Sequence, residues 1–306
     1  MSVSQSIKQQ CRYAGKSIAL ATKHKKADAL ALPLSAGLGA AVKTIEIDTD
    51  IFGTFLGEIE RKKTPLLTAR EKARLGMRKA KMPCGLASEG SFGSHISVPF
   101  VIANEEVVVF VDDELGIEIS ESIVTTKTNF AQMTVGSIHE AESFLLQTQF
   151  PSHALIARPN QYNANPIEKL LGRFFKKSAF KHIQKGLQTR EALMAAVRAS
   201  ARNSADGLVR LETDMRAHMN PTRMRVIRQL GVKLARRLRS TCPECACPGF
   251  GATGVAGALP CQECGQPTES HAYEVSTCQK CHYTKSEKRR DGVIEEQSMH
   301  CLFCNP

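Results

Sequence analysis

The sequence has no tryptophan, and aromatic residues make up only 6% of its 306 residues. Proteins that bind single-stranded nucleic acid by stacking its bases need aromatic side chains, so this chain is poorly supplied for that mode of binding. No apolar run reaches the ~18 residues of a transmembrane helix, which predicts that no segment spans a membrane. The first 13 residues are polar and lack the apolar segment of a secretion signal. We therefore expect a cytoplasmic protein.

The eleven cysteines need an explanation other than disulfides, which are rare in the cytoplasm. Eight of them form four Cys-x-x-Cys pairs near the C-terminus: Cys242/Cys245, Cys261/Cys264, Cys278/Cys281 and Cys301/Cys304. This spacing lets both thiolates of a pair bind one metal ion, and two pairs complete a tetrahedral zinc shell. The first pair is separated from the second by 15 residues and the third from the fourth by 19, and both gaps fit the spacing of zinc ribbons. We predict two zinc ions.

Two pairings of these knuckles are open. The sequential one, which we favour, joins the first knuckle to the second and the third to the fourth. The interleaved one joins the first to the third and the second to the fourth. The Gly-rich stretch between the first two knuckles predicts a loop, and Asp291-Gly292 predicts a hairpin between the last two. Because four thiolates leave no open position on the metal, the zinc ions are expected to be structural.

The net charge of +11 is concentrated in the middle of the chain. Residues 158–240 hold 19 basic and 5 acidic residues, whereas residues 1–157 are neutral and residues 241–306 carry −3. One interpretation is a set of solvated basic helix faces. The other is a surface that binds a polyanion, which predicts a nucleotide or nucleic acid as the partner of residues 158–240.

Apolar and polar patterns alternate between strand and helix in the first half of the chain. They predict strands at 17–22, 42–47, 82–87 and 154–157, helices at 29–38 and 66–81, and a hairpin of strands 105–112 and 117–126. This order favours an α/β (or α+β) fold with a mixed sheet. Helices are predicted at 138–147, 166–188, 189–201 and 221–239. We expect an α/β domain of residues 1–240, with a basic helical insertion near 160–205, followed by a double zinc ribbon at 241–306.

The acidic segment Asp48–Arg61 follows the second predicted strand. Its carboxylates Asp50, Glu58 and Glu60, together with Glu89, could hold Mg²⁺ or Mn²⁺, because these ions prefer oxygen ligands. The alternative is an ordinary acidic loop.

Two loops after predicted strands carry histidine. His24 lies beside Lys25, and His95 ends the Ser- and Gly-rich loop 88–95. Either histidine, or Glu89, could act as a general acid or base. Lys25 and Arg61 are candidates for binding phosphate. The alternative for each histidine is a structural role.

Polar residues alternate over residues 212–220. If this stretch is extended, one face carries Glu212, Asp214, Arg216, His218 and Asn220. Asn220-Pro221 is a strong start for the helix that follows. The N-terminus of that helix, beside Arg216 and Arg223, would favour a phosphate. The alternative is a salt-bridged junction between a strand and a helix.

The chain resembles an uncharacterised family of bacterial proteins that is defined as a domain of unknown function. The resemblance rests on residues 21–26 (ATKHKK), 48–61, 87–95 and 212–224, and on the eight-cysteine tail ending in Cys-Asn-Pro. Lys23 and Lys26 depart from it, because less basic residues are expected there, and residues 160–190 look like an insertion. The order of elements is also distantly similar to the Maf and inosine-triphosphate pyrophosphatase group, which would make Lys25, Glu58/Glu60 and Glu89 counterparts of its functional residues.

Three functions follow from these observations. The leading one is a metal-dependent enzyme that acts on a phosphate-bearing substrate, either a nucleotide or a nucleic acid. The second is a nucleic-acid-binding protein without catalysis, and the third is a structural or partner-binding role. The enzyme hypothesis assigns catalysis to Glu58, Glu60, Glu89, His95, Asp214 and His218, and phosphate binding to Lys25, Arg61, Arg216 and Arg223.

Overall fold

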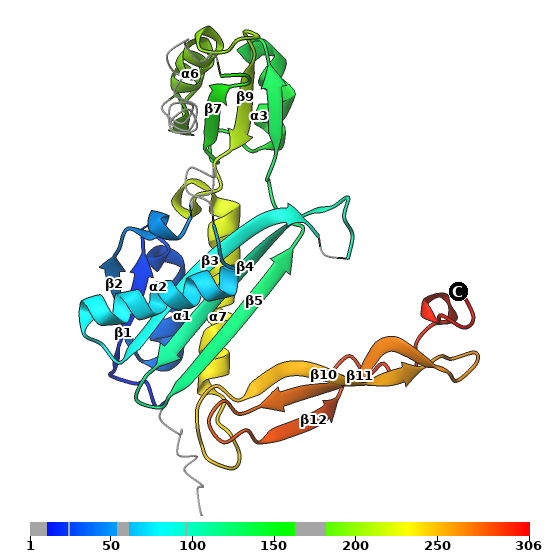
Figure 1. The fold of residues 1–306 in the computed structure, drawn as a ribbon. Helices are drawn as coiled ribbons and strands as arrows, with labels where there is room; N and C mark the ends of the chain where they lie inside the picture. The colour runs from blue at the N-terminus through cyan, green and yellow to red at the C-terminus, as the bar shows by residue number, and fades with distance from the viewer. Residues whose placement is uncertain (1–10, 24, 54–60, 96, 163–181) are drawn as a thin grey trace, which may run out of the picture.

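The fold contains three β-sheets that follow one another along the chain. The computed structural model describes residues 11–23, 25–53, 61–95, 97–162 and 182–306, without the side chains of residues 49 and 50. A five-stranded sheet lies at the centre, a four-stranded sheet lies beyond one end of it, and a long three-stranded ribbon extends from the other end (Figure 1). None of the described helices is both long enough and apolar enough to cross a membrane.

The five-stranded sheet has the strand order β2-β1-β3-β4-β5. Strand β1 (Ser17–Thr22) is parallel to β2 (Ala41–Glu46) on one side and to β3 (Cys84–Ser94) on the other. Helix α1 (Ala27–Leu38) joins β1 to β2, and helix α2 (Pro65–Ala80) joins β2 to β3. The antiparallel strands β4 (Ile102–Asp112) and β5 (Ile117–Thr125) complete the sheet. The predicted α/β fold with a mixed sheet is confirmed.

Two predicted local structures in this region are wrong. The predicted loop 88–95 is mostly strand, since β3 continues to Ser94 and pairs with β4 along its length. Serine and glycine have weak β propensity, but pairing with the apolar strand β4 overrides it. The helix predicted at 29–38 also starts two residues earlier, because α1 begins at Ala27 with Lys26 in the N-cap position.

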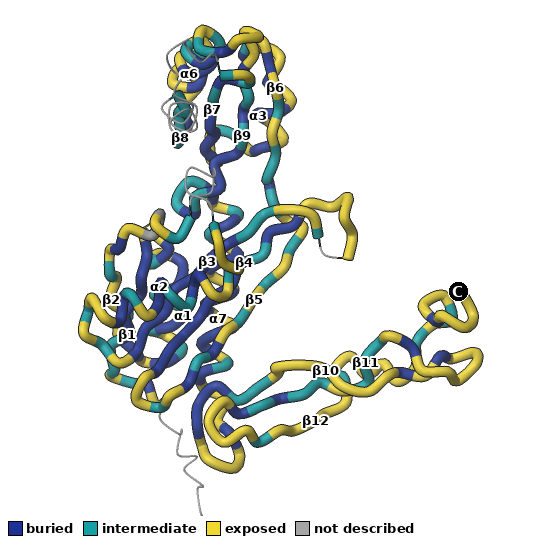
Figure 2. Tube along the Cα trace, viewed as in Figure 1, coloured by how far each residue is buried: buried dark blue, intermediate teal, exposed yellow. Residues whose placement is uncertain are grey.

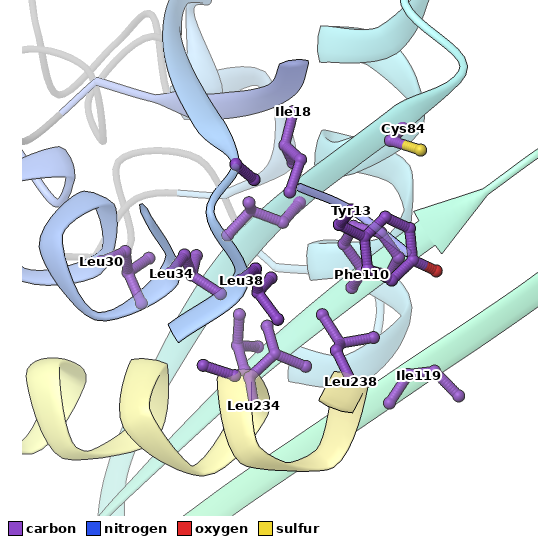
Figure 3. Packing of buried hydrophobic residues seen from close by; sticks show 14 of the residues in the cluster. Tyr13, Ile18, Leu30, Leu34, Leu38, Cys84, Phe110, Ile119, Leu234 and Leu238 are labelled. Carbon is purple, nitrogen blue, oxygen red and sulfur yellow. The ribbon is translucent and has the colours of Figure 1, made fainter. Parts of the chain in front are cut away.

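Apolar layers cover both faces of this sheet. Helices α1 and α7 (Pro221–Arg239) pack on one face, where the largest cluster of buried side chains includes Tyr13, Phe110 and Leu234 (Figure 3). Helix α2 packs on the other face over Ala21, Ala87 and Val109. Figure 2 shows the inner strands β1, β3 and β4 mostly buried between the two helical layers, while the edge strands and most of the ribbon are exposed or half-buried.

Helices α1 and α7 cross at very short range. A Cβ atom at Gly37 of α1 would lie 2.8 Å from the Cβ of Ala235, and Gly231 of α7 faces Leu30 and Pro33 in the same way. Glycine is therefore required at this crossing for packing.

Replacing Gly37 by valine should destabilise the protein by about 2 kcal/mol, because added methyl groups in a packed interface displace their neighbours. Urea unfolding measures the change. The matched control is Ala36→Val on the exposed side of the same helix, which should cost less than about 0.7 kcal/mol, the range of ordinary helix propensities. Equal losses for the two variants would contradict the close crossing.

The second sheet has the strand order β6-β9-β7-β8 and is antiparallel. Its strands are β6 (Gln132–Val135), β7 (Leu155–Pro159), β8 (Gln184–Leu187) and β9 (Val209–Thr213). A 3-10 turn (Ile138–Ala141), α3 (Glu142–Gln147) and α6 (Arg190–Arg202) pack around it and form a separate apolar core.

The helix predicted at 166–188 is wrong at its end, where residues 184–187 form β8; residues 163–181 lie outside the described part of the chain. The expected extended face over 212–220 is also wrong. Strand β9 ends at Thr213, and Ala217–Met219 form a 3-10 turn. The chain turns because the Asp214 carboxylate accepts a hydrogen bond from the backbone N–H of Arg216, at 3.1 Å.

Buried polar contacts join the second sheet to helix α7. The Asn220 side chain caps α7 by accepting from the Arg223 N–H at 2.9 Å, and its amide donates to the side-chain oxygen Oδ1 of Asn129 at 2.8 Å. His153 Nε2 lies 2.9 Å from the Thr222 hydroxyl and accepts from the Thr222 N–H at 3.2 Å. The first N–H groups of α7 are thus satisfied by protein groups, so the expected phosphate site at this helix N-terminus is not supported.

The C-terminal ribbon contains β10 (Gly251–Pro260), β11 (Pro267–Thr277) and β12 (Thr284–Lys288). β11 pairs antiparallel with both of its neighbours. The loop predicted between the first two knuckles is therefore mostly strand β10. The hairpin predicted between the last two knuckles is replaced by pairing of β12 with β11.

The base of the ribbon contacts the main body. Gly249, at φ +89°, packs so closely that a Cβ there would lie 2.5 Å from Ile119 Cδ1. The Arg237 guanidinium of α7 donates to the carbonyls of Gly249 (2.6 Å) and Ala252 (2.7 Å). The predicted domain boundary at residue 240 stays a prediction.

Candidate functional site

The carboxyl end of β1 is the topological switch point of the five-stranded sheet. The chain leaves β1 through α1 to reach β2 on one side, and it crosses over through α2 to reach β3 on the other. Ligands of open α/β sheets bind outside the carboxyl ends of the strands at such a point. The register pairs Leu20 with Leu86, so Thr22 at the end of β1 lies beside Ser88 of β3.

Glu89 of β3 binds two cations with its two carboxylate oxygens. Lys72 Nζ of α2 lies 2.5 Å from Oε2, and Arg61 Nη2 lies 2.6 Å from Oε1. Arg61 also donates to the Gly90 carbonyl at 3.0 Å. The sequence predicts that Glu89 helps to hold a divalent cation. Because both of its oxygens already accept charged hydrogen bonds, Glu89 is poorly placed for that role.

A second buried ion pair lies on the opposite face of the sheet. Arg223 of α7 donates through Nε to Glu106 Oε1 at 2.6 Å and also bonds to the Met215 carbonyl. The guanidinium carbon of Arg223 lies 5.3 Å from the centre of the Phe92 ring. Position 90 must be glycine, because a Cβ there would overlap the Arg223 guanidinium and the Glu106 carboxylate. Arg223, expected to bind phosphate, is thus largely engaged by protein groups.

Lys26 lies between these two ion pairs. Its ammonium donates to the Ser88 carbonyl at 2.8 Å, and the side chain is only 8% exposed. The pKa of Lys26 is lowered to about 8: burial is the largest cause, repulsion by Arg223 and Lys72 adds to it, and attraction by Glu89 and Glu106 opposes it. We name this group of six side chains the switch-point cluster: Lys26, Arg61, Lys72, Glu89, Glu106 and Arg223.

The switch-point cluster has more positive than negative charge. Among the described residues its four cations face two carboxylates, of which Glu106 is fully buried and Glu89 is 8% exposed. Burial raises the pKa of Glu89, but Lys26, Lys72 and Arg61 outweigh that effect and lower it overall. Glu89 is therefore ionised at neutral pH and cannot serve as a general acid there. Surplus buried charge is costly unless a counter-ion compensates it.

Two buried hydroxyls beside the cluster have no hydrogen-bond partner among the described residues. They are Thr22 Oγ1 and Ser88 Oγ, on residues that are 5% and 4% exposed. Side chains alternate along a strand, so both hydroxyls lie on the face of Leu20 and Leu86, the face covered by α1 and α7. Buried polar groups are almost always hydrogen-bonded, so these two hydroxyls have unused hydrogen-bonding capacity that a polar ligand could satisfy.

Three more residues predicted to belong to the site, Lys25, Asp214 and Arg216, lie near His218. Burial lowers the pKa of His218, the Arg216 and Lys25 charges lower it further, and Asp214 opposes them. The buried Asp214 carboxylate accepts hydrogen bonds from Arg216 Nε at 2.9 Å and from the Gly186 N–H at 3.0 Å. Asp214 and Arg216 therefore form a salt-bridged turn, the structural alternative for this segment, and His218 is neutral at pH 7.

The structure does not bring His95 to the switch point. His95 follows β3 at the far end of the β3–β4 hairpin, six residues beyond Glu89, which is ~20 Å along an extended strand. Its Nδ1 accepts a hydrogen bond from the Ser97 N–H at 3.2 Å. His24, Glu58 and Glu60 lie outside the described residues, as does the side chain of Asp50. Their expected roles, and with them the expected Mg²⁺ or Mn²⁺, stay predictions.

Sequence reasoning missed Lys26, Lys72 and Glu106. Glu106 lies at the start of the strand predicted at 105–112, where two acidic residues precede an apolar stretch. Strand alternation was the available signal, because Glu106 shares a face with the buried residues Val108 and Phe110.

The eight cysteines form two groups of four, and the pairing is interleaved. Cys242, Cys245, Cys278 and Cys281 make the base site, and Cys261, Cys264, Cys301 and Cys304 make the tip site. The favoured sequential pairing is wrong. Strand β10 separates the first knuckle from the second by ten residues, or ~33 Å, while its antiparallel partner β11 returns the chain to the base.

Both groups have the dimensions of a tetrahedral thiolate shell. The Sγ–Sγ distances between knuckles are 3.6 Å for Cys242–Cys281 and 3.8 Å for Cys261–Cys304. Four sulfurs at ~2.3 Å from a central zinc would be ~3.8 Å apart. The base and tip sites can therefore each bind one metal ion.

Together these features define an α/β protein with a charged switch point and a C-terminal ribbon that carries two four-cysteine metal sites. Residues 72–306 match the family described as "Domain of unknown function (DUF6671)", and the chain belongs to this family. Neither the curated proteins nor the solved structures contain a match to the chain.

Proposed function

We propose that the protein is an enzyme that acts on a phosphate-bearing substrate, a nucleotide or nucleic acid, bound at the switch point. The observation that carries this proposal is the buried surplus of positive charge beside two unpartnered hydroxyls. A phosphate group would neutralise the surplus and accept hydrogen bonds from Thr22 and Ser88. Phosphoryl transfer needs positive charge around the equatorial oxygens, which Lys26 could supply on the face of the two hydroxyls, while Arg61 lies with Glu89 on the opposite face.

The metal ions of the ribbon have a different role in this proposal. Both sites have four thiolates, and zinc is the ion that such shells usually hold. A closed shell leaves no position for substrate, so the zinc ions stabilise the ribbon. Any Mg²⁺ or Mn²⁺ would have to be held by Asp50, Glu58 and Glu60 without Glu89.

The proposal is tested by calorimetric titration with inorganic phosphate, pyrophosphate and a nucleotide panel, followed by phosphate-release assays with and without Mg²⁺. The double variant Thr22→Val, Ser88→Ala removes only the unpartnered hydroxyls. It should weaken binding at least ~10-fold and leave stability unchanged or raised, because a buried hydroxyl without a partner costs about 1–3 kcal/mol. Lys43→Met, an exposed change on β2, is the control. Binding that the double variant retains in full would refute the site.

Nucleic-acid binding without catalysis is the second candidate function. The observation that favours it is the excess of 19 basic over 5 acidic residues in 158–240. It predicts affinity for DNA or RNA that is independent of the switch-point cluster and falls steeply with salt, because bound counter-ions are released.

A further inference from the structure

Helix α7 carries a row of arginines on its solvent face. Its exposed positions include Arg225, Arg228, Val232, Arg236 and Arg239. At 3.6 residues per turn these five positions fall within an arc of about 80°, and the row spans ~21 Å along the helix. We call the four arginines of this row the arginine stripe.

The other basic residues of α7 have acidic partners, whereas the stripe has none among the residues that the structure describes. Arg223 pairs with Glu106, and Lys233 and Arg237 pair with Glu121. Within the described part of the chain, no stripe arginine forms an ion pair with an acidic side chain; Arg228 has only a 3.4 Å contact with the Asp28 carbonyl. Acidic side chains of the sheet thus neutralise the basic residues on either side of the stripe, and the positive charge of the stripe itself is not neutralised by them.

Stability of the helix does not explain this row. α7 contains seven basic residues and no acidic one, so the stripe has no helical partner of opposite charge. Like charges three or four residues apart cost a few tenths of a kcal/mol per pair. The helix dipole favours the cations of the last turn, Arg236 and Arg239, but it disfavours Arg225 and Arg228 in the N-terminal half. An external anion would remove the repulsion along the whole row.

We propose that the arginine stripe binds the sugar–phosphate backbone of a nucleic-acid duplex. All four residues are arginine, whose planar guanidinium binds phosphate in a bidentate manner. The ~21 Å length matches the rise of about six phosphates on one strand, at ~3.4 Å each. A duplex fits better than a single strand, because the stripe contains no aromatic residue on which bases could stack.

The stripe lacks the features of a membrane-binding helix. Such helices place Trp, Phe or Leu beside their basic face so that an apolar surface can enter the lipid. The only apolar residue among the five exposed positions of this row is Val232, which is 36% exposed. Sequence-specific recognition is not part of this inference, because backbone contacts position a duplex without reading its bases.

The arginine stripe would provide the binding surface for the second candidate function, nucleic-acid binding, and it is separate from the switch-point site. Arg223, the α7 residue of the switch-point cluster, faces Glu106 and is not part of the stripe. A duplex could therefore bind to α7 whether or not a phosphate occupies the cluster.

The test uses the full chain loaded with zinc and a labelled DNA duplex of mixed sequence, followed by fluorescence anisotropy between about 50 and 200 mM salt. One variant replaces the stripe: Arg225→Gln, Arg228→Gln, Arg236→Gln and Arg239→Gln. The matched control removes the same charge from four other exposed arginines: Arg12→Gln, Arg78→Gln, Arg198→Gln and Arg202→Gln. Circular dichroism confirms that both variants are folded.

The stripe variant should lose about three to four units of the salt slope, since each phosphate contact contributes ~0.9, and bind at least ~10-fold more weakly. The control variant should keep the slope within about one unit. Equal loss in the two variants would refute the stripe and leave general charge as the cause. No duplex binding by the unaltered protein would refute the nucleic-acid function itself. Binding to phosphatidylserine vesicles in place of the duplex, lost in the stripe variant, would overturn the proposal in favour of a membrane.

Discussion

Removing the base metal site will unfold most of the protein, whereas removing the tip site will not. The base variant is Cys245→Ser, Cys281→Ser and the tip variant is Cys264→Ser, Cys304→Ser. All four residues are exposed ligands, and each variant removes two thiolates from one site. The chemical change is therefore matched, and only the surroundings of the two sites differ.

The expected difference comes from the packing of the base site. Cys242 and Cys278 belong to the largest apolar core, together with Cys247, and the Phe250 and Tyr283 rings pack with centroids 5.9 Å apart beside them. Structural zinc in small domains contributes on the order of 10 kcal/mol of folding free energy. Loss of the base ion therefore loosens the ends of α7 and β5, on which the five-stranded sheet depends.

The tip site, by contrast, lies at the free end of the ribbon. Leu302 and Phe303 beside it are 62% and 67% exposed, so little apolar surface is lost with the metal. The tip variant should bind one metal ion fewer and keep its main unfolding transition within about 1 kcal/mol, the usual limit for changes far from a core.

Metal content by mass spectrometry and urea unfolding followed by far-ultraviolet circular dichroism measure both effects. The near-ultraviolet signal of Tyr13, which is fully buried against Phe110, reports on the main core. If the two variants lost the same stability, the base site would not be part of the main core. Chelation should reproduce the base variant and not the tip variant.

Local patterns predicted the elements well but not the contacts between them. Strand β1 was placed at its observed bounds, and the Asn220 cap was found from residue type alone. The cysteine spacing likewise predicted two four-thiolate sites. These features depend on neighbouring residues, which a sequence shows directly.

The features that were missed depend on partners far away in the chain. β10 is rich in glycine and alanine and becomes a strand only because β11 pairs with it, and this pairing decides which knuckles share a metal. Arg223 and Glu106 are 117 residues apart, and Lys26 and Ser88 are 62 apart. No periodicity connects such pairs, so the switch-point cluster could not be assembled before the fold was known.

Replacing Lys26 by methionine should abolish phosphate binding and leave the protein as stable as before, or more stable. Methionine has nearly the same length and no charge, so it removes one cation from a cluster that has a surplus. The loss of the hydrogen bond to the Ser88 carbonyl costs about 1 kcal/mol. The relief of the buried charge is worth up to about 3 kcal/mol, because the pKa falls from 10.5 to about 8 and each unit is worth ~1.4 kcal/mol.

The lowered pKa of Lys26 predicts that the free energy of unfolding rises with pH. Below about pH 8 Lys26 is protonated in both the folded and the unfolded chain, and the folded chain carries the full penalty of the buried charge. Between about pH 8 and 10.5 the folded chain has lost this proton and the unfolded chain still holds it, so the free energy of unfolding rises with pH. Above that range the penalty is gone.

The difference between the wild-type protein and Lys26→Met isolates this contribution, because the other titrating groups are common to both. Urea unfolding is measured at several pH values between about 7 and 10.5. Over this range the free energy of unfolding of the wild type should rise relative to that of the variant by up to ~3 kcal/mol. Lys43→Met, on the exposed surface of β2, should run parallel to the wild type. A Lys26→Met protein destabilised by more than ~2 kcal/mol, with an unchanged pH dependence, would show that Lys26 only supports the fold.

Phosphate binding should follow the opposite course with pH. A bound phosphate favours protonated Lys26 and raises its pKa, so affinity is constant below about pH 8 and falls as the free protein loses this proton. A phosphate monoester keeps its charge over this range, since its second pKa is about 6. Stability that rises while affinity falls, both around the pKa of one buried lysine and both lost in Lys26→Met, would be expected only of a binding site that is strained without its anion.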